Sequence, residues 1–242
     1  MSDVITKRNG LFIVGTVLLT IGAAVTTFAT FFVFFYGIPV IAFVVGLILV
    51  WLSGRTIKTK AFLTVTPIVV FFAYQYFWRL SNTADPETFL IPSSFRGKVH
   101  VLFNESCGQE EKYENDRRVY DIPDNGILLT KFKDEYGFID HQYFFVDSLG
   151  NRTMIPKMDV RDFNEEWTIE KNPKEPSRDS LGVFHWGTTG NGEHLDEGKY
   201  YYQEFYVATY RQLSDSFGFQ YDKQFDSIEY KLLKDCRKIG VK

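Results

Sequence analysis

The chain has 242 residues, of which 24% are charged and 45% hydrophobic, and its formal net charge is −3. These averages conceal a division near residue 80. Residues 1–80 hold six basic residues against Asp3 alone, whereas the other 162 residues hold 21 basic and 29 acidic ones. The division excludes a single soluble globule, a fibrous repeat and a disordered chain. The net charge of −8 in the second part also argues against nucleic acid as a partner.

Three apolar stretches predict membrane-spanning helices within a membrane region of residues 1–80. Residues 11–54 contain no charged residue and no His, and these 44 residues would form about 66 Å of helix, roughly twice a hydrocarbon core. Glycine and proline in Tyr36–Pro39 divide this run into spans at about 11–35 and 38–52. A third uncharged stretch, 61–78, contains Pro67 and is the least apolar of the three.

The basic residues predict how these helices are oriented. Lys7 and Arg8 precede the first span, and three more basic residues lie between the second and third spans. Because such residues favour the cytoplasmic side, we expect a cytoplasmic N-terminus, with the C-terminal domain outside the membrane. The absence of charge within the spans argues against a pump or transporter.

Small residues recur on the first two predicted helices. Gly15, Gly22 and Ala29 are seven residues apart, and Ala42 and Gly46 are four apart. Such spacing lets helix backbones approach closely, which predicts packing within the bundle. A homo-oligomer formed through these faces is the alternative.

The second part predicts a tether, residues 81–94, followed by a domain at 95–242 that is mainly an antiparallel β-sandwich with a C-terminal helix. Short strand-like runs alternate with turn signals. Arg118–Ile122 and Ile127–Phe132 are expected to form one hairpin, and Gln142–Val146 and Arg152–Ile155 another. Further strands are expected at Leu181–Trp186 and Tyr200–Tyr210.

Two segments interrupt or end this pattern. Apolar residues at helical spacing from Phe225 to Cys236 predict the terminal helix. Residues 156–180 hold 12 charged residues in 25. A solvated, partly disordered excursion is expected there, and a flap over a site is the alternative.

Several strand and turn sequences resemble an uncharacterised bacterial family of exported or membrane-anchored β domains, a domain of unknown function. The resemblance covers about Ile91 to Cys236 and is carried by IPSSFRGKVHVLF, RVYDIPDNGILLTKF, QYFFVDSLGNRTMIP and FHWGTTG. Gly97–Val99 and the Tyr120–Gly126 turn are its most specific parts. The family has no established catalytic residues, so the resemblance implies an envelope location and no chemistry.

No catalytic or cofactor-binding motif is identified. Weak candidates for a metal site are His185, His194 and Asp196, since two His and a carboxylate can form an open site. Their spacing matches no known signature, so no metal or other cofactor is expected. Gly187–Gly192 resembles a phosphate loop only in its glycines, and a turn is expected there.

Cys107 and Cys236 are the two cysteines of the chain. An oxidising compartment would permit a disulfide between them. Two separate thiols, with Cys236 buried on the apolar stripe of the terminal helix, are the alternative.

These observations favour a membrane-anchored extracytoplasmic module that binds or scaffolds an unidentified ligand or envelope protein. An envelope enzyme, such as a metal-dependent hydrolase using the region of His185 and His194, is the alternative. The lipid bilayer is the one partner that the composition itself indicates.

Overall fold

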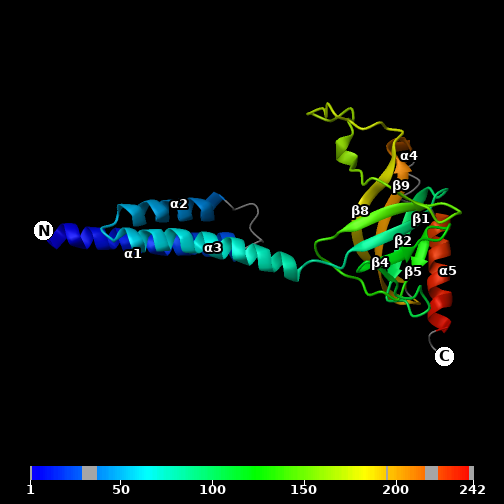
Figure 1. Ribbon diagram of the computed structural model, residues 1–242, viewed down its shortest axis with the longest axis horizontal. Helices are drawn as coiled ribbons and strands as arrows, with labels where there is room; N and C mark the ends of the chain where they lie inside the picture. Colours follow the sequence, from blue (N-terminus) through cyan, green and yellow to red (C-terminus); the bar gives the residue numbers. More distant parts are fainter. Residues whose placement is uncertain (1, 29–36, 195, 216–222, 240–242) are drawn as a thin grey trace. The chain divides into compact units, whose positions relative to one another are not determined.

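The computed structural model describes residues 2–28, 37–194, 196–215 and 223–239. The chain divides into two compact units, Met1–Asn82 and Thr83–Lys242, which are described separately below. The first is helical, and the second combines nine strands with short and long helices in the described ranges (Figure 1).

The helical unit contains α1 (Ser2–Phe28), α2 (Gly37–Leu52) and α3 (Ile57–Ser81). The side chain of Thr56 caps α3, and Pro67 lies within it. Two segments, Arg8–Thr27 and Ile57–Ser81, are long and apolar enough to cross a membrane. α2 is more apolar than either but has 16 residues, about 24 Å, which is less than a full span requires. Residues 29–36, by which the first two predicted spans would be extended, lie outside the described residues.

Glycines allow α1 and α2 to pack closely against each other. A Cβ atom at Gly22 would lie 2.6 Å from the backbone nitrogen of Phe43, and one at Gly15 would lie 2.8 Å from Cβ of Leu49. Gly46 is enclosed in the same way by the backbone of α1. The predicted small-residue faces thus serve packing within the chain, as Gly15, Gly22 and Gly46 show. Ala42 is half-buried, and Ala29 lies outside the described residues.

Two mixed sheets form the second unit. The first has the order β3-β4-β1-β6-β7 and the second has the order β5-β2-β9-β8. The strands of the first sheet are β3 (Tyr113–Glu114), β4 (Arg117–Asp121), β1 (Glu87–Pro92), β6 (His141–Val146) and β7 (Arg152–Met154). Those of the second are β5 (Ile127–Leu129), β2 (Gly97–Phe103), β9 (Gly198–Thr209) and β8 (Leu181–His194).

The two sheets share one apolar core, to which every second residue of the central strands contributes. Val99, Val101 and Phe103 of β2 meet Phe89 and Ile91 of β1 there, and all five are buried. The other face of β2 turns toward α5 (Lys223–Ile239), where Leu102 packs with Phe225 and Leu233. α5 confirms the predicted terminal helix and runs along the second sheet (Figure 1).

An antiparallel arrangement is the wrong expectation for these sheets. β1 is parallel to both of its neighbours, β4 and β6, and β2 is parallel to β5. The predicted hairpin of residues 118–132 is therefore wrong as well, because β4 and β5 belong to different sheets. The β6–β7 hairpin is confirmed.

Two further expectations require correction. The predicted tether 81–94 contains β1, the buried central strand of the first sheet, so only residues 82–86 connect α3 to it. The apolar part of β1, Phe89–Ile91, is only three residues long, so the sequence shows no alternation that would predict a strand there. The predicted turn at Gly187–Gly192 is instead part of β8, which pairs with β9 as far as His194.

Candidate functional site

The predicted metal ligands lie far apart. His185 and His194 are nine residues apart on β8, which corresponds to roughly 25–30 Å in an extended strand. Asp196 lies beyond His194, where Tyr230 donates a hydrogen bond of 3.2 Å to its carboxylate. Among the described residues no group of three His, Cys, Asp or Glu side chains is arranged to hold a metal ion. β8 therefore does not bring His185 together with His194 and Asp196, the weak candidates for a metal site.

A β-bulge surrounds His185. The pairing of β8 with β9 shifts between Phe184 and Thr188, and both His185 (φ 53°) and Gly187 (φ 79°) adopt left-handed backbone angles. A non-glycine residue in this region carries a cost in free energy, so the bulge is imposed by its surroundings. It leaves His185 and Trp186 exposed at the edge of the second sheet.

A shallow cavity of about 240 Å³ adjoins this bulge. It is lined by His185 and Trp186 and by the segment Met158–Arg161. Arg161 donates hydrogen bonds to the Asp159 carboxylate, which lowers the pKa of Asp159. Nζ of Lys157 lies 4.9 Å from the Trp186 ring centre. The cavity can accept a side chain or another small group.

A buried polar network between the sheets was missed by sequence reasoning. His141 Nε2 lies 2.8 Å from the Glu87 carboxylate, and Tyr120 donates a hydrogen bond of 2.9 Å to the same carboxylate. Tyr143 and Gln203 each lie 3.2 Å from the other ring nitrogen of His141. Burial, together with the charge of Glu87, raises the pKa of Tyr120, so the phenol stays protonated and donates. The parallel register of β1 and β6, which pairs Glu87 with His141, could not be read from the sequence.

A second buried network joins α5 to the sheet. The two ring nitrogens of His100 face the carboxylates of Glu229 on α5 and Glu204 on β9, and Lys98 lies 3.0 Å from Glu204. Burial opposes a charge on His100, but the hydrogen bonds to Glu204 and Glu229 raise its pKa above 6.5. Burial also opposes the charge on Glu204, yet the contacts with His100 and Lys98 lower its pKa to about 2. The arrangement is a buried imidazole held between two carboxylates.

Two further contacts fix α5 in place. The structure pairs Cys107 with Cys236 in a disulfide, with 5.4 Å between their Cα atoms. The guanidinium of Arg237 donates a hydrogen bond of 3.0 Å to Glu105, whose side chain is buried. The polar residues around α5 therefore hold this helix against the sheet.

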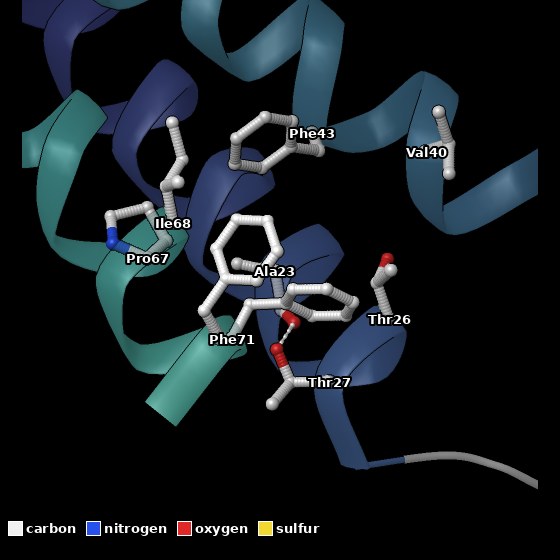
Figure 2. Close-up of a pocket in the computed structure, with 9 residues that line it drawn as sticks. Ala23, Thr26, Thr27, Val40, Phe43, Pro67, Ile68 and Phe71 are labelled. Carbon is white, nitrogen blue, oxygen red and sulfur yellow. Dashed lines mark hydrogen bonds between the residues drawn. The ribbon is translucent and has the colours of Figure 1, made fainter. Parts of the chain in front are cut away.

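A cavity of about 230 Å³ lies within the helical unit (Figure 2). Ala23, Thr26 and Thr27 of α1 face Phe43 of α2 and Phe71 of α3 across it. Both threonine hydroxyls donate to carbonyls one turn earlier, those of Gly22 and Ala23. Because these hydroxyls are already satisfied, the cavity offers a ligand an apolar lining alone.

Residues 156–180, called the excursion from here on, extend away from the sheets between β7 and β8 (Figure 1). Phe163 is buried and stacks on Tyr210, with ring centres 3.9 Å apart. The Asn164 side chain bonds the backbone of Asn172 at both its oxygen and its nitrogen. The excursion is solvated as expected, with Phe163 as its buried residue, but these contacts order this part of it, so the expectation of partial disorder is wrong there.

Two large apolar side chains project from this ordered loop into solvent. Trp167 is 80% exposed and Ile169 is 98% exposed. They lie among Glu165, Glu166 and Glu170. Exposed apolar groups of this size on a fixed loop are typical of contact surfaces.

A family model described as "Family of unknown function (DUF6843)" matches residues 83–217. The match covers more than half of the chain and begins where the second compact unit begins. The chain belongs to the DUF6843 family. The DUF6843 match thus confirms the predicted resemblance to a domain of unknown function.

Among solved structures, the DUF6843 chain is similar to a crystal structure described as a "putative lipoprotein" from Bacillus anthracis. The two share 19% sequence identity with a TM-score of 0.37, and the match covers 52% of this chain and 71% of the other. No curated protein matches the chain.

Proposed function

We propose that the protein is a membrane-anchored module that holds its DUF6843 domain outside a bacterial cytoplasmic membrane and binds an envelope protein there. The observation that carries the proposal is the exposed pair Trp167 and Ile169 on the ordered excursion. The buried ionisable groups of the His100 and Glu87 networks bond within the domain, so these contacts account for them without a ligand.

Anchoring is supported by the apolar surface of the helical unit. Large apolar side chains such as Ile13, Val17, Phe62 and Phe72 are at least half exposed, as expected for surfaces that meet lipid. Three crossings, with α2 as the second, would place the N-terminus inside and the domain outside. The basic residues before α1 and between α2 and α3 favour this orientation.

The enzyme alternative depended on a site shared by His185 and His194. A metal-dependent hydrolase at His185 and His194 requires the two side chains to share one ion, and β8 separates them along its length. Binding needs no such convergence. It needs an accessible surface with fixed geometry, and the excursion provides one.

Photocrosslinking in living cells tests the proposed contact surface. A photoreactive amino acid at Thr168, between the two exposed apolar residues, is expected to form one discrete adduct with an envelope protein. The same group at Leu149, which is 86% exposed on the β6–β7 turn, is the matched control and should form none. The adduct should disappear when Trp167 and Ile169 are both replaced by Ala, and should persist in the His185→Ala, His194→Ala double variant.

Two outcomes would contradict the proposal. Equal adducts from positions 168 and 149 would indicate collision without recognition. Loss of the adduct in the histidine variant, with a circular dichroism spectrum unchanged from wild type, would return the function to the His185 and His194 region.

A further inference from the structure

β8 is an edge strand whose outer side is only partly occupied. It ends the order β5-β2-β9-β8, so β9 pairs with one side of it. On the outer side, Met158 N–H donates to the Val183 carbonyl and Val183 N–H donates to the Pro156 carbonyl, both at 2.9 Å. Beyond Val183, no residue in the described ranges pairs with this side. The domain's own chain therefore shows that this edge accepts a strand, and no described residue pairs with the rest of it.

The main-chain groups that point outward can be assigned. Successive residues of a strand direct their N–H and C=O groups to alternate sides. Val183 points outward, so Phe184 points toward β9, where it faces Tyr206. After the bulge, Thr188 faces Glu204, which is two residues from Tyr206 and so also points toward β8. Thr188, Gly190 and Gly192 therefore bond β9, and Thr189, Asn191 and Glu193 direct their main-chain groups outward.

Apart from the bulge between Phe184 and Thr188, this stretch lacks the usual features that protect an edge strand. From Trp186 to Gly192 there is no charged residue and no proline, although both commonly block edge-to-edge pairing. The Tyr202 ring lies directly over Gly190, where a Cβ atom would come 2.7 Å from the ring, and Tyr200 covers Gly192 in the same way. The rings thus supply an apolar surface beside the open backbone.

Charge and shape differ at the two ends of the edge. The turn of residues 193–199 carries carboxylates on Glu193, Asp196 and Glu197 and the ammonium group of Lys199, and α5 brings Nζ of Lys234 to 3.9 Å from the Asp196 carboxylate. At the other end lies the cavity of about 240 Å³ beside Trp186. An extended chain along β8 would meet a pocket for one side chain at the bulge and negative charge at the turn.

We propose that the outer edge of β8, from Thr189 to Glu193, binds an extended basic peptide segment of a partner protein by strand addition. The peptide backbone pairs with Thr189, Asn191 and Glu193, and its basic side chains lie near the acidic turn. A second copy of this chain is disfavoured as the occupant, since each domain carries a net charge of −8. The proposal rests on the function proposed above but uses residues other than Trp167 and Ile169.

Hydrogen exchange at single residues tests the edge directly. The full chain in nanodiscs is mixed with a capped synthetic peptide, Lys-Val-Thr-Val-Lys-Val-Lys, or with its counterpart carrying Glu in place of Lys. The basic peptide is expected to slow exchange of the Thr189 and Asn191 amides by about tenfold or more, as one added hydrogen bond of about 1.4 kcal/mol predicts. The Gly190 and Gly192 amides, which bond β9, should not change.

A matched pair of variants isolates the outward main-chain group. Asn191→Pro removes one outward N–H and leaves the bonds to β9, whereas Asn191→Ala keeps that N–H. We expect peptide affinity to fall about tenfold in Asn191→Pro and to change little in Asn191→Ala. If Asn191→Pro fails to fold, Thr189→Lys should weaken the basic peptide by charge repulsion, with Thr189→Ser as its control.

Three results would overturn the proposal. The first is no protection of Thr189 and Asn191 at saturating peptide, and the second is equal binding of the acidic and basic peptides. The third is protection without peptide that grows with protein concentration, which would assign the edge to a second copy. The Trp167→Ala, Ile169→Ala variant should bind the peptide normally, so failure of the contact surface on the excursion and failure of the β8 edge are distinguishable.

Discussion

At the scale of single residues, His100 links the stability of the domain to pH. Its side chain is buried between the carboxylates of Glu204 and Glu229, with Lys98, Tyr202 and Phe225 around it. Because the pKa of His100 is raised in the folded chain, its stabilising contribution is fully present below pH 6.5. That contribution is lost as the pH rises through the raised pKa.

Replacing His100 with Gln should therefore cost more at low pH than at high pH. We expect a loss in the free energy of unfolding of about 1.5–3 kcal/mol at pH 6, the range for hydrogen bonds to charged groups, and a smaller loss at pH 9. Thermal unfolding of the full chain in detergent, followed by circular dichroism, measures the difference. His185→Gln is the control because His185 is exposed, and an equal loss for His100→Gln at both pH values would contradict the assignment.

The stability of the domain also depends on the hydrogen bond that the Tyr120 phenol donates to the buried Glu87 carboxylate. Tyr120→Phe would leave a buried carboxylate oxygen without its donor and should lower the free energy of unfolding by about 1–3 kcal/mol. Tyr113→Phe, at a tyrosine that is 52% exposed on β3, should change it little. Chemical unfolding of the two variants side by side checks this, and equal stabilities would show that water or another group replaces the phenol.

At the scale of elements, the contact of α1 with α2 depends on the absence of side chains at its glycines. A methyl group at Gly22 would meet backbone atoms of Phe43 and Pro39 at 2.6 and 2.7 Å, so Gly22→Ala must push the helices apart. Overpacking of this kind costs about 1–3 kcal/mol. Gly10→Ala on the same helix meets nothing within 4 Å and is the matched control.

Thermal stability in detergent, read from the helical signal, should fall for Gly22→Ala and stay level or rise for Gly10→Ala. A loss of equal size in both would contradict the packing explanation, because Ala favours a helix over Gly at either position.

The docking of α5 has a covalent component. Replacing both Cys107 and Cys236 with Ser removes a loop closure of about 130 residues, which the chain-entropy model values at about 4–5 kcal/mol. The double variant should unfold at a lower temperature than the oxidised wild type, and reductant should lower the wild type to the same level. Reductant that leaves the wild type unchanged would show that the thiols are free in protein taken from cells.

At the scale of the whole molecule, the number of crossings decides the compartment. Three crossings deliver the C-terminus outside, whereas two leave it in the cytoplasm. We expect alkaline phosphatase fused after Lys242 to be active and green fluorescent protein fused there to be dark. The opposite pair of results would mean that α2, with its 16 residues, does not cross.

The sequence predicted where helices and strands lie better than it predicted which of them lie side by side. Hydrophobic periodicity located α5 and β9, and a Gly-Asn turn located the β6–β7 hairpin. It could not locate the parallel pairing of β1 with β4 and β6, because strands brought together from distant parts of the chain leave no local signal. The same limit hid both buried networks, since Glu87 and His141 are joined by register and His100 and Glu229 by helix docking. The His185 and His194 site failed for a related reason, because an extended strand separates residues that are close in sequence.

The disulfide also makes most of the domain a closed covalent ring. One cut in the backbone between Cys107 and Cys236 opens that ring but releases no fragment, because both new ends remain attached through sulfur. The excursion and the β8–β9 turn both lie inside the ring. A protease that clips either of them would therefore leave the domain in one piece, and only a second cut or reduction would free part of it. A single cut in the excursion or in the β8–β9 turn is thus expected to leave the domain joined through its disulfide.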